Sequence, residues 1–411
     1  MYITVKAACL LICSLILLLT PGCWDRSELE ELGIIAAIGM DYDAEEDVFE
    51  VTAAVVRPMD LAGGEDPAQG GDTKPFRLVT TRGDTLSGAL EQQNVMLSRT
   101  PYFAHNDVVI LGEELARRGM HLVLDRMVRE RDMRMNMQLV VIDENVKEMM
   151  RSGAKLEQGL PLELRQMLKL RHQRSYRPIT DLRTFTRDLL QAGADPYLPL
   201  LSSRLETPVV PQEIEQAGQV DEEDKIRYPK LFGTAVFRED KLVGFLEGHA
   251  TKGLLYVKGD ILDARETIED PYGKPGKVVL IPLDVETEII PLFEEGEPHV
   301  LLDIEKEGDI CCQTSASNLF TEEAMEIMQQ EKEKIIKAHI REALEKSQEW
   351  EADIFAIGRE FHRLLPQKWE LIQDDWRYIY AELEVDIKVT SRIRRTGLIE
   401  RAPFYEYHTE E

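Results

Sequence analysis

The sequence predicts an α+β fold of several domains, in which mixed sheets pack against helices and a three-domain body follows a cleaved signal peptide. Three observations carry this prediction. The chain has 411 residues, more than a single hydrophobic core usually serves. Short apolar runs typical of strands alternate along it with amphipathic stretches of helical period. One longer apolar run stands at the N-terminus and has the length of an export signal.

The composition is ordinary for a globular protein except in its charge. The chain carries 49 basic and 76 acidic residues, a formal net charge of −27. Such a surface repels nucleic-acid phosphates and anionic lipid headgroups. We therefore expect no nucleic-acid partner, and attachment to a membrane would need a device other than charge.

The N-terminal segment supplies that device. The apolar run from Ala7 to Leu19 is too short for an ordinary transmembrane helix and fits a signal-peptide core. Gly22 and Cys23 follow it, as at a lipoprotein processing site, although Thr20 and Pro21 depart from the usual residues. Residues 1–22 are thus predicted to be a cleaved lipoprotein signal peptide.

Lipidation of Cys23 would give the mature chain two acyl chains, the number that stable anchoring needs. No later apolar run reaches about 18 residues, so the mature protein would be tethered to the membrane and would not span it. The alternative is an uncleaved N-terminal anchor. Either arrangement leaves the body on the outer face of the cytoplasmic membrane.

The first domain is predicted over residues 23–201. Apolar runs predict its strands, and capped amphipathic stretches predict its helices. The acidic turn at residues 41–47 resembles the start of a calcium loop, but Glu46 and Thr52 replace the glycine and glutamate that such a loop needs. We interpret it as a hairpin turn. The strands are expected at 32–40, 48–56, 77–81, 108–111 and 138–142, and the helices at 85–97, 113–129, 144–151, 160–170 and 181–191.

A middle, hairpin-rich domain is predicted over residues 202–276, because a polar, acidic stretch at 202–230 marks a boundary. Two apolar runs joined by the turn Arg238–Lys241 form a hairpin beyond it. Further short strands are expected at 253–257 and 278–281.

The last domain is predicted over residues 277–400, followed by a tail at 401–411. Thr321 is expected to cap a long helix that reaches Trp350, and we interpret its apolar stripe as a core-packing face rather than a partner surface. The other elements are a strand around 300–305, a helix at 353–365 stopped by a proline, and an alternating strand at 383–389.

The cysteines outside the N-terminal segment are Cys311 and Cys312. Neighbouring residues on a strand point to opposite faces, so we expect no disulfide between them. Both are predicted to be buried or half-buried strand residues rather than redox groups.

A search for catalytic chemistry gives nothing. Phosphate-binding loops, the dinucleotide fingerprint, the nucleophile elbow and the zincin motif are all absent. Ser152 and Lys155 have an SxxK spacing but lack companion motifs. His105, His249 and His362 form no pair at helical spacing. The sequence therefore predicts no catalytic residue, no cofactor and no metal site, and we do not expect an enzyme.

Several segments together resemble the Ger(x)C family, the lipoprotein C subunits of spore germinant receptors. The lipid-bearing cysteine begins the first of them, and the last two lie near the C-terminus. The segments are CWDRSEL (23–29), HNDVVILGEELARRG (105–119), GTAVFREDKLVGFLEG (233–248), ADIFAIGREFHR (352–363) and IRRTG (393–397).

This resemblance implies a three-domain α+β body without catalysis. It also implies a complex with two integral-membrane partners, an A subunit and a permease-like B subunit, in the inner membrane of the spore. The complex would respond to small nutrients such as amino acids or sugars. Cys23, the lipidation residue, is the only chemically defined site that carries over.

Two other functions compete with this one. A solute-binding lipoprotein of a transporter would share the anchor, but it predicts two α/β lobes around a ligand cleft. An envelope hydrolase would need a nucleophile with a base, or a metal set, and the sequence shows neither.

Overall fold

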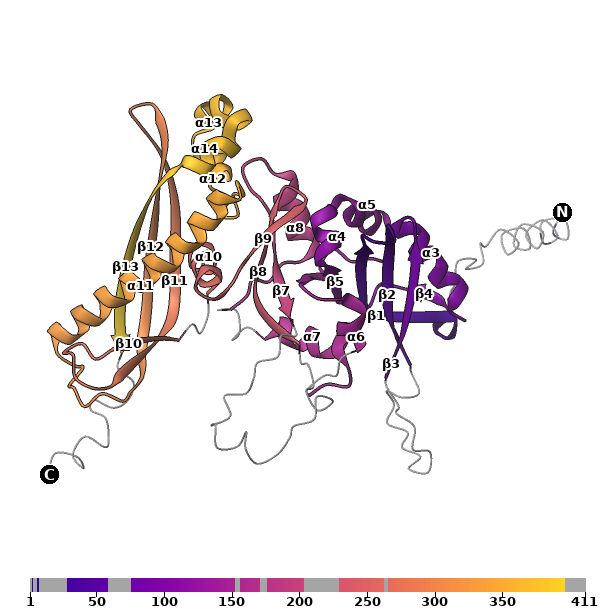
Figure 1. Cartoon of the computed structure of the whole chain (residues 1–411), viewed down its shortest axis with the longest axis horizontal. Coiled ribbons are helices and arrows are strands. Elements are labelled where there is room, and N and C mark those ends of the chain that lie inside the picture. Colours follow the sequence, from indigo (N-terminus) through magenta and orange to yellow (C-terminus); the bar gives the residue numbers. More distant parts are fainter. Residues whose placement is uncertain are drawn as a thin grey trace.

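The structure is a computed structural model that describes Tyr2, Lys6 and residues 28–57, 75–151, 156–170, 176–202, 229–261 and 265–395. Within these residues the chain forms two β-sheets, each packed with helices (Figure 1). The α+β class and the multidomain organisation predicted from the sequence are thereby confirmed. Among the helices that are described, none is long and apolar enough to cross a membrane. Cys23 lies outside the described residues.

The first sheet is mixed, with the strand order β3-β2-β1-β5-β6-β7-β8-β9, and β4 pairs with the start of β1. β1, β5, β6 and β7 are parallel neighbours, whereas the pairs at both ends of the sheet are antiparallel. The strands are β1 (Leu32–Asp43), β2 (Val48–Val56), β3 (Phe76–Gly83), β4 (Thr100–Tyr102), β5 (Val108–Gly112), β6 (Gln138–Ile142), β7 (Tyr197–Ser202), β8 (Lys230–Arg238) and β9 (Lys241–Leu246).

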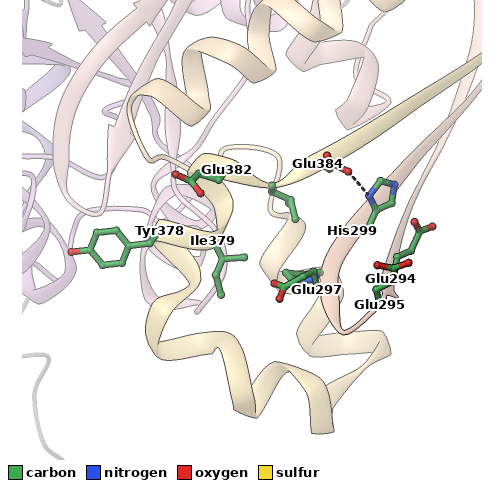
Figure 2. Close-up of a pocket in the computed structure, with 10 residues that line it drawn as sticks. Glu294, Glu295, Glu297, His299, Tyr378, Ile379, Glu382 and Glu384 are labelled. Carbon is green, nitrogen blue, oxygen red and sulfur yellow. Dashed lines mark ion pairs between the residues drawn. The ribbon is translucent and has the colours of Figure 1, made fainter.

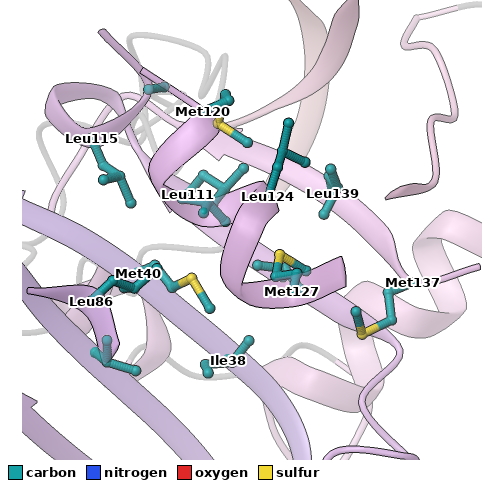
Figure 3. Close-up of a cluster of buried hydrophobic side chains, with 14 of the residues drawn as sticks. Ile38, Met40, Leu86, Leu111, Leu115, Met120, Leu124, Met127, Met137 and Leu139 are labelled. Carbon is teal, nitrogen blue, oxygen red and sulfur yellow. The ribbon is translucent and has the colours of Figure 1, made fainter. Parts of the chain in front are cut away.

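Helices cover both faces of this sheet, which explains why every residue of β5 is buried. One face packs on α3, α4, α5 and α8, in a core that includes Ile38, Met40 and Leu111 (Figure 3). The other face packs on α6 and α7. The helices are α3 (Leu86–Met96), α4 (Glu113–Arg118), α5 (His121–Arg129), α6 (Val146–Arg151), α7 (Leu160–Lys169) and α8 (Leu182–Leu190).

The single helix expected over residues 113–129 is two helices. Gly119 separates them with a φ of 139°, a conformation that residues with a side chain rarely adopt. The N–H of Met120 donates to the carbonyl of Asp240, so the break is held by the β8–β9 turn. The prediction was wrong because helical periodicity continues across a turn that a distant segment fixes.

The second sheet has the order β10-β11-β12-β13. β11 and β12 form a long antiparallel hairpin, and β13 lies parallel to β12. The sequence predicted only short pieces of this hairpin, because its middle is charged and does not look like a buried strand. The strands are β10 (Glu266–Glu269), β11 (Lys277–Glu294), β12 (Glu297–Gln313) and β13 (Glu384–Arg395).

The long helix α11 (Glu322–Glu349) crosses one face of this sheet, and Thr321 caps it as predicted. Its inward stripe packs on β12 and on α10 (Gly248–Lys258), which confirms the core-packing interpretation. The remaining helices are α12 (Ile357–Leu364), α13 (Pro366–Ile372) and α14 (Trp376–Glu382), besides 3-10 turns at Leu29–Glu31 and Gln373–Asp375.

The segment expected to be a strand at 253–257 lies inside α10 and is therefore helical. Its apolar run is buried on all sides, and a run of that length does not distinguish a strand from a buried helix. Gly253 faces α11 so closely that a Cβ there would overlap the carbonyl oxygen of His339. Close helix packing therefore explains the glycine.

The hairpin β8–β9 continues the first sheet, whereas α10 packs on α11 beside the second sheet. The division of the body at residues 202–276 stays a prediction. Cys311 and Cys312 do lie on a strand, β12, but both are exposed. Their predicted burial was wrong: Ile310 beside them packs with Met328 of α11, but the two cysteine side chains do not join that cluster.

Candidate functional site: the junction between the two sheets

The connection between α11 and α12 carries a set of buried polar contacts. A helix was expected from Asp353 onward, but α12 begins only at Ile357. The Asp353 carboxylate, which is 2% exposed, accepts hydrogen bonds from the N–H groups of Ile357 (2.9 Å) and Gly358 (2.8 Å). It also accepts one from the Trp376 indole N–H (3.1 Å), so it holds α12 and α14 together.

Asp195 ties this connection to the first sheet. It lies between α8 and β7, and its carboxylate accepts hydrogen bonds from the N–H groups of Asp353 (2.8 Å) and Glu239 (2.7 Å). Its own N–H donates to the Asp353 carbonyl at 2.9 Å. One carboxylate therefore joins three segments that are far apart in the sequence: the α8–β7 loop, the β8–β9 turn and the α11–α12 connection.

Two glycines allow the backbones to meet at this junction. Gly193 has a φ of 77°, and its carbonyl accepts the Arg359 N–H at 2.9 Å. A Cβ on Gly358 would lie 2.6 Å from the Cα of Gly193, closer than real Cβ atoms approach. Any side chain at either position would push the two segments apart.

Ion pairs surround the buried contacts. Arg359 pairs with Asp188 (3.3 Å), Arg238 with Glu351 (3.3 Å) and Arg377 with Glu239 (2.7 Å). Each joins one half of the molecule to the other. Because these side chains are partly exposed, each pair contributes little to stability, about 0–1 kcal/mol.

Burial dominates the electrostatics of the junction. Desolvation raises the pKa of Asp353 to about 6, although the N–H groups of Gly358 and Ile357 oppose the shift. Desolvation also raises the pKa of Asp195. Burial, together with the nearby Arg359, lowers the pKa of Lys258 to about 8. The junction therefore holds ionisable groups whose charge is costly to bury.

An acidic groove of about 650 Å³ lies next to the junction, between the tip of the β11–β12 hairpin and α14 (Figure 2). α14 contributes Tyr378 and Ile379 to the groove and, one turn earlier, the Trp376 that binds Asp353. His299 at its edge pairs with Asp386 (3.1 Å) and with Glu384 (3.8 Å). The glutamates that line the groove are Glu294, Glu295, Glu297, Glu382 and Glu384.

A second buried polar cluster lies beneath α11. The Lys306 ammonium donates to the Tyr256 hydroxyl (2.7 Å) and lies 3.4 Å from the Glu266 carboxylate, to which the same hydroxyl donates. Lys332 is also buried there, so one carboxylate, that of Glu266, balances the charge of two lysines. Desolvation and the second lysine lower the pKa of Lys306 well below its usual value, despite the attraction of Glu266.

His339, on α11 near this cluster, should make the stability of the fold depend on pH. His339 is 7% exposed and stacks on His249 with ring centroids 4.4 Å apart. Burial, helped by His249, lowers the pKa of His339 from 6.5 to about 4. Between pH 6.5 and about pH 4, His339 is therefore protonated in the unfolded chain and neutral in the folded chain. The free energy of unfolding consequently falls as the pH falls through this window.

We expect His339→Phe to remove about 2 kcal/mol of this pH dependence between pH 6.5 and pH 4, after allowance for partial screening. Urea unfolding at several pH values measures it. The exposed His362→Phe is the matched control and should leave the pH dependence unchanged. Parallel curves for wild type and His339→Phe would contradict the assignment.

The structure places the sequence candidates as follows. His105 contacts Tyr102 and His362 lies near Trp369, at ring separations of 5.9 and 6.0 Å. Ser152 and Lys155 lie outside the described residues. Among the residues that are described, no group of three or more histidine, cysteine or acidic side chains could hold a metal ion. Sequence reasoning missed Asp195, since a lone aspartate between a helix and a strand carries no local signal.

The sequence matches two protein-family models, one in each half of the chain. Residues 25–203 match the family described as the spore germination protein N-terminal domain, and residues 232–397 match the one described as spore germination B3/GerAC like, C-terminal. The chain belongs to the GerAC family of spore germination proteins. Asp353 lies in the second match, within the segment 352–363 that carried the resemblance to Ger(x)C proteins, and its partner Asp195 lies in the first.

Individual relatives agree with this GerAC assignment. Spore germination protein KC of Bacillus subtilis is 25% identical over 407 residues, which is 95% of either chain. Spore germination protein B3 of the same organism is 22% identical over 93% of this chain and 96% of its own. Among solved structures, the GerBC protein matches with a TM-score of 0.52 and 17% identity, covering 87% of this chain and 97% of its own. This last likeness confirms the fold.

Proposed function

We propose that this GerAC-family protein is the non-enzymatic, lipid-anchored C subunit of a nutrient germinant receptor. The observation that carries the proposal is the family match across both halves of the chain. The relatives in Bacillus subtilis are named as spore germination proteins, and they align with nearly the full length of this chain. The subunit would act through contacts with integral-membrane A and B subunits.

Anchoring at Cys23 completes the proposal. Diacylglyceryl transfer to its thiol would hold the body on the outer face of the inner spore membrane. The body carries a large negative charge and would not stay there by electrostatic attraction. A tethered subunit can meet membrane partners repeatedly, because the tether keeps its local concentration high.

The junction supports a mechanical role for the body. The Asp195 carboxylate joins the two halves and the Asp353 carboxylate holds α12 and α14 to the same connection, so a partner bound to one half would hold the other half in a defined place. A solute-binding protein would instead need a ligand cleft between its lobes. At this junction Asp353 is buried and Gly193 touches Gly358, so the contact is closed by protein.

Deletion of the gene followed by complementation tests this function. We expect spores of the deletion strain to lose nutrient-triggered germination at least tenfold in rate, while agents that bypass receptors still germinate them. The wild-type gene should restore the response, and Cys23→Ala should not, because its product would lack labelled fatty acid. Normal nutrient germination without the gene, with no paralogue present, would contradict the proposal.

A further inference from the structure

The last turn of α3 exposes apolar side chains that the fold does not use. α3 buries Leu86, Ala89, Leu90 and Gln93 against the sheet, at the spacing of one helix face. Val95 lies on the opposite face and Met96 at the edge of the buried face, and they are 85% and 60% exposed. Glu91 is the only charged residue of α3, although 30% of the whole chain is charged. This helix end therefore exposes two apolar side chains and carries no charged one.

This helix end lies where the chain enters the first sheet. Leu32 and Gly33 at the start of β1 pair with Thr100 and Pro101 of β4. A Cβ on Gly33 would lie 3.6 Å from the Cβ of Arg99, which follows Met96 by three residues. Figure 1 shows α3 and β4 together at the N-terminal end of the molecule, away from α13.

The tether limits how far this end can move from the membrane. Cys23 precedes Glu28, the first residue of the described body, by five residues. Five residues span at most about 18 Å in any conformation. A lipid on Cys23 would therefore keep the start of β1, and with it the end of α3, within reach of the lipid headgroups.

We infer that Val95 and Met96 rest on the bilayer surface and that this contact fixes the orientation of the tethered body. The inference depends on the proposed lipidation of Cys23. The contact is apolar, because Glu28, Glu30 and Glu31, which precede β1, would not favour anionic headgroups. Medium-sized apolar side chains at the boundary of the acyl chains are the kind of group that interfacial helices insert there.

Fluorescence quenching by lipid tests this contact. The mature, lipid-bearing chain is reconstituted in phosphatidylethanolamine–phosphatidylglycerol vesicles whose acyl chains carry a quencher. Cys311→Ser and Cys312→Ser remove the exposed thiols, and Met96→Cys receives an environment-sensitive dye. Leu371→Cys is the matched control, because Leu371 is similarly exposed (77%) but lies on α13, far from the tether.

We expect at least twofold stronger quenching at position 96 than at position 371. The quenching should not fall in 0.5 M salt, because the contact is apolar and salt screens the repulsion between the acidic body and anionic lipid. Val95→Gln should reduce the quenching at position 96 and leave the circular dichroism spectrum unchanged. Equal quenching at the two positions, or quenching lost in salt, would overturn the inference.

Flotation of the vesicles separates this inference from the proposal on which it rests. If wild type floats with the vesicles and Cys23→Ala does not, the anchor is present and the quenching alone decides the orientation. If wild type fails to float, the proposed anchor and the inferred orientation are both wrong.

Discussion

Asp353→Ala should lower the free energy of unfolding of the C-terminal half by about 3–5 kcal/mol. The change leaves the N–H groups of Ile357, Gly358 and Trp376 buried without an acceptor. Each unsatisfied buried donor costs about 1–3 kcal/mol. The sum is reduced because the charged carboxylate is itself costly to bury, as its raised pKa shows.

Guanidinium unfolding followed by tryptophan fluorescence measures this loss. Three of the four tryptophans, Trp350, Trp369 and Trp376, lie in the C-terminal half, so most of the signal reports on it. Asp374→Ala is the matched control: Asp374 is exposed two residues before Trp376, and its removal should cost less than about 0.5 kcal/mol. Equal stability of the two variants would show that the Asp353 hydrogen bonds contribute nothing.

Asp353→Ala should also uncouple the two sheets. The N–H of residue 353 would still donate to Asp195 of the first half. The α11–α12 connection that carries this N–H would, however, lose the carboxylate that binds it to α12. We expect limited proteolysis to cleave near residues 351–358 in the variant and not in wild type. If the body transmits a mechanical signal, spores carrying this variant should respond to nutrients more slowly at equal protein level.

Glu266→Gln should destabilise the C-terminal half by a similar amount, about 3–5 kcal/mol. It removes the carboxylate that faces two buried lysines, and an uncompensated buried charge is strongly unfavourable. Burial alone would raise the pKa of Glu266, but Lys306 and Lys332 outweigh burial and lower it, so the carboxylate is charged at neutral pH.

A substitution of one of the lysines distinguishes the loss of charge balance from a simple loss of packing. Lys306→Met removes one of the two lysines, leaves Glu266 with Lys332, and should cost clearly less than Glu266→Gln. Glu269→Gln on the same strand is the matched control, because that side chain is 77% exposed. A larger loss in Lys306→Met than in Glu266→Gln would contradict the assigned charge balance. Urea unfolding at pH 7 compares the three.

The sequence alone determined the elements that local physics specifies. Apolar runs located β2 and β6, the helical period of apolar residues located the stripe of α11, and a threonine at the helix start gave the cap at Thr321. These features need only neighbours in the chain, so the residues that produce them are visible without the fold. The family resemblance likewise rested on local segments.

The tertiary structure alone decided the features that depend on distant partners. Gly119 ends a helix because the β8–β9 turn binds there, and residues 253–257 are helical because α11 packs against them. The helix expected from Asp353 begins only at Ile357, because Ala356 before it has a left-handed φ of 61°, and the N–H of Asp353 is held by Asp195. The meeting of Asp195 with Asp353, 158 residues later, is set by the packing of two sheets, and no periodicity in the sequence records it.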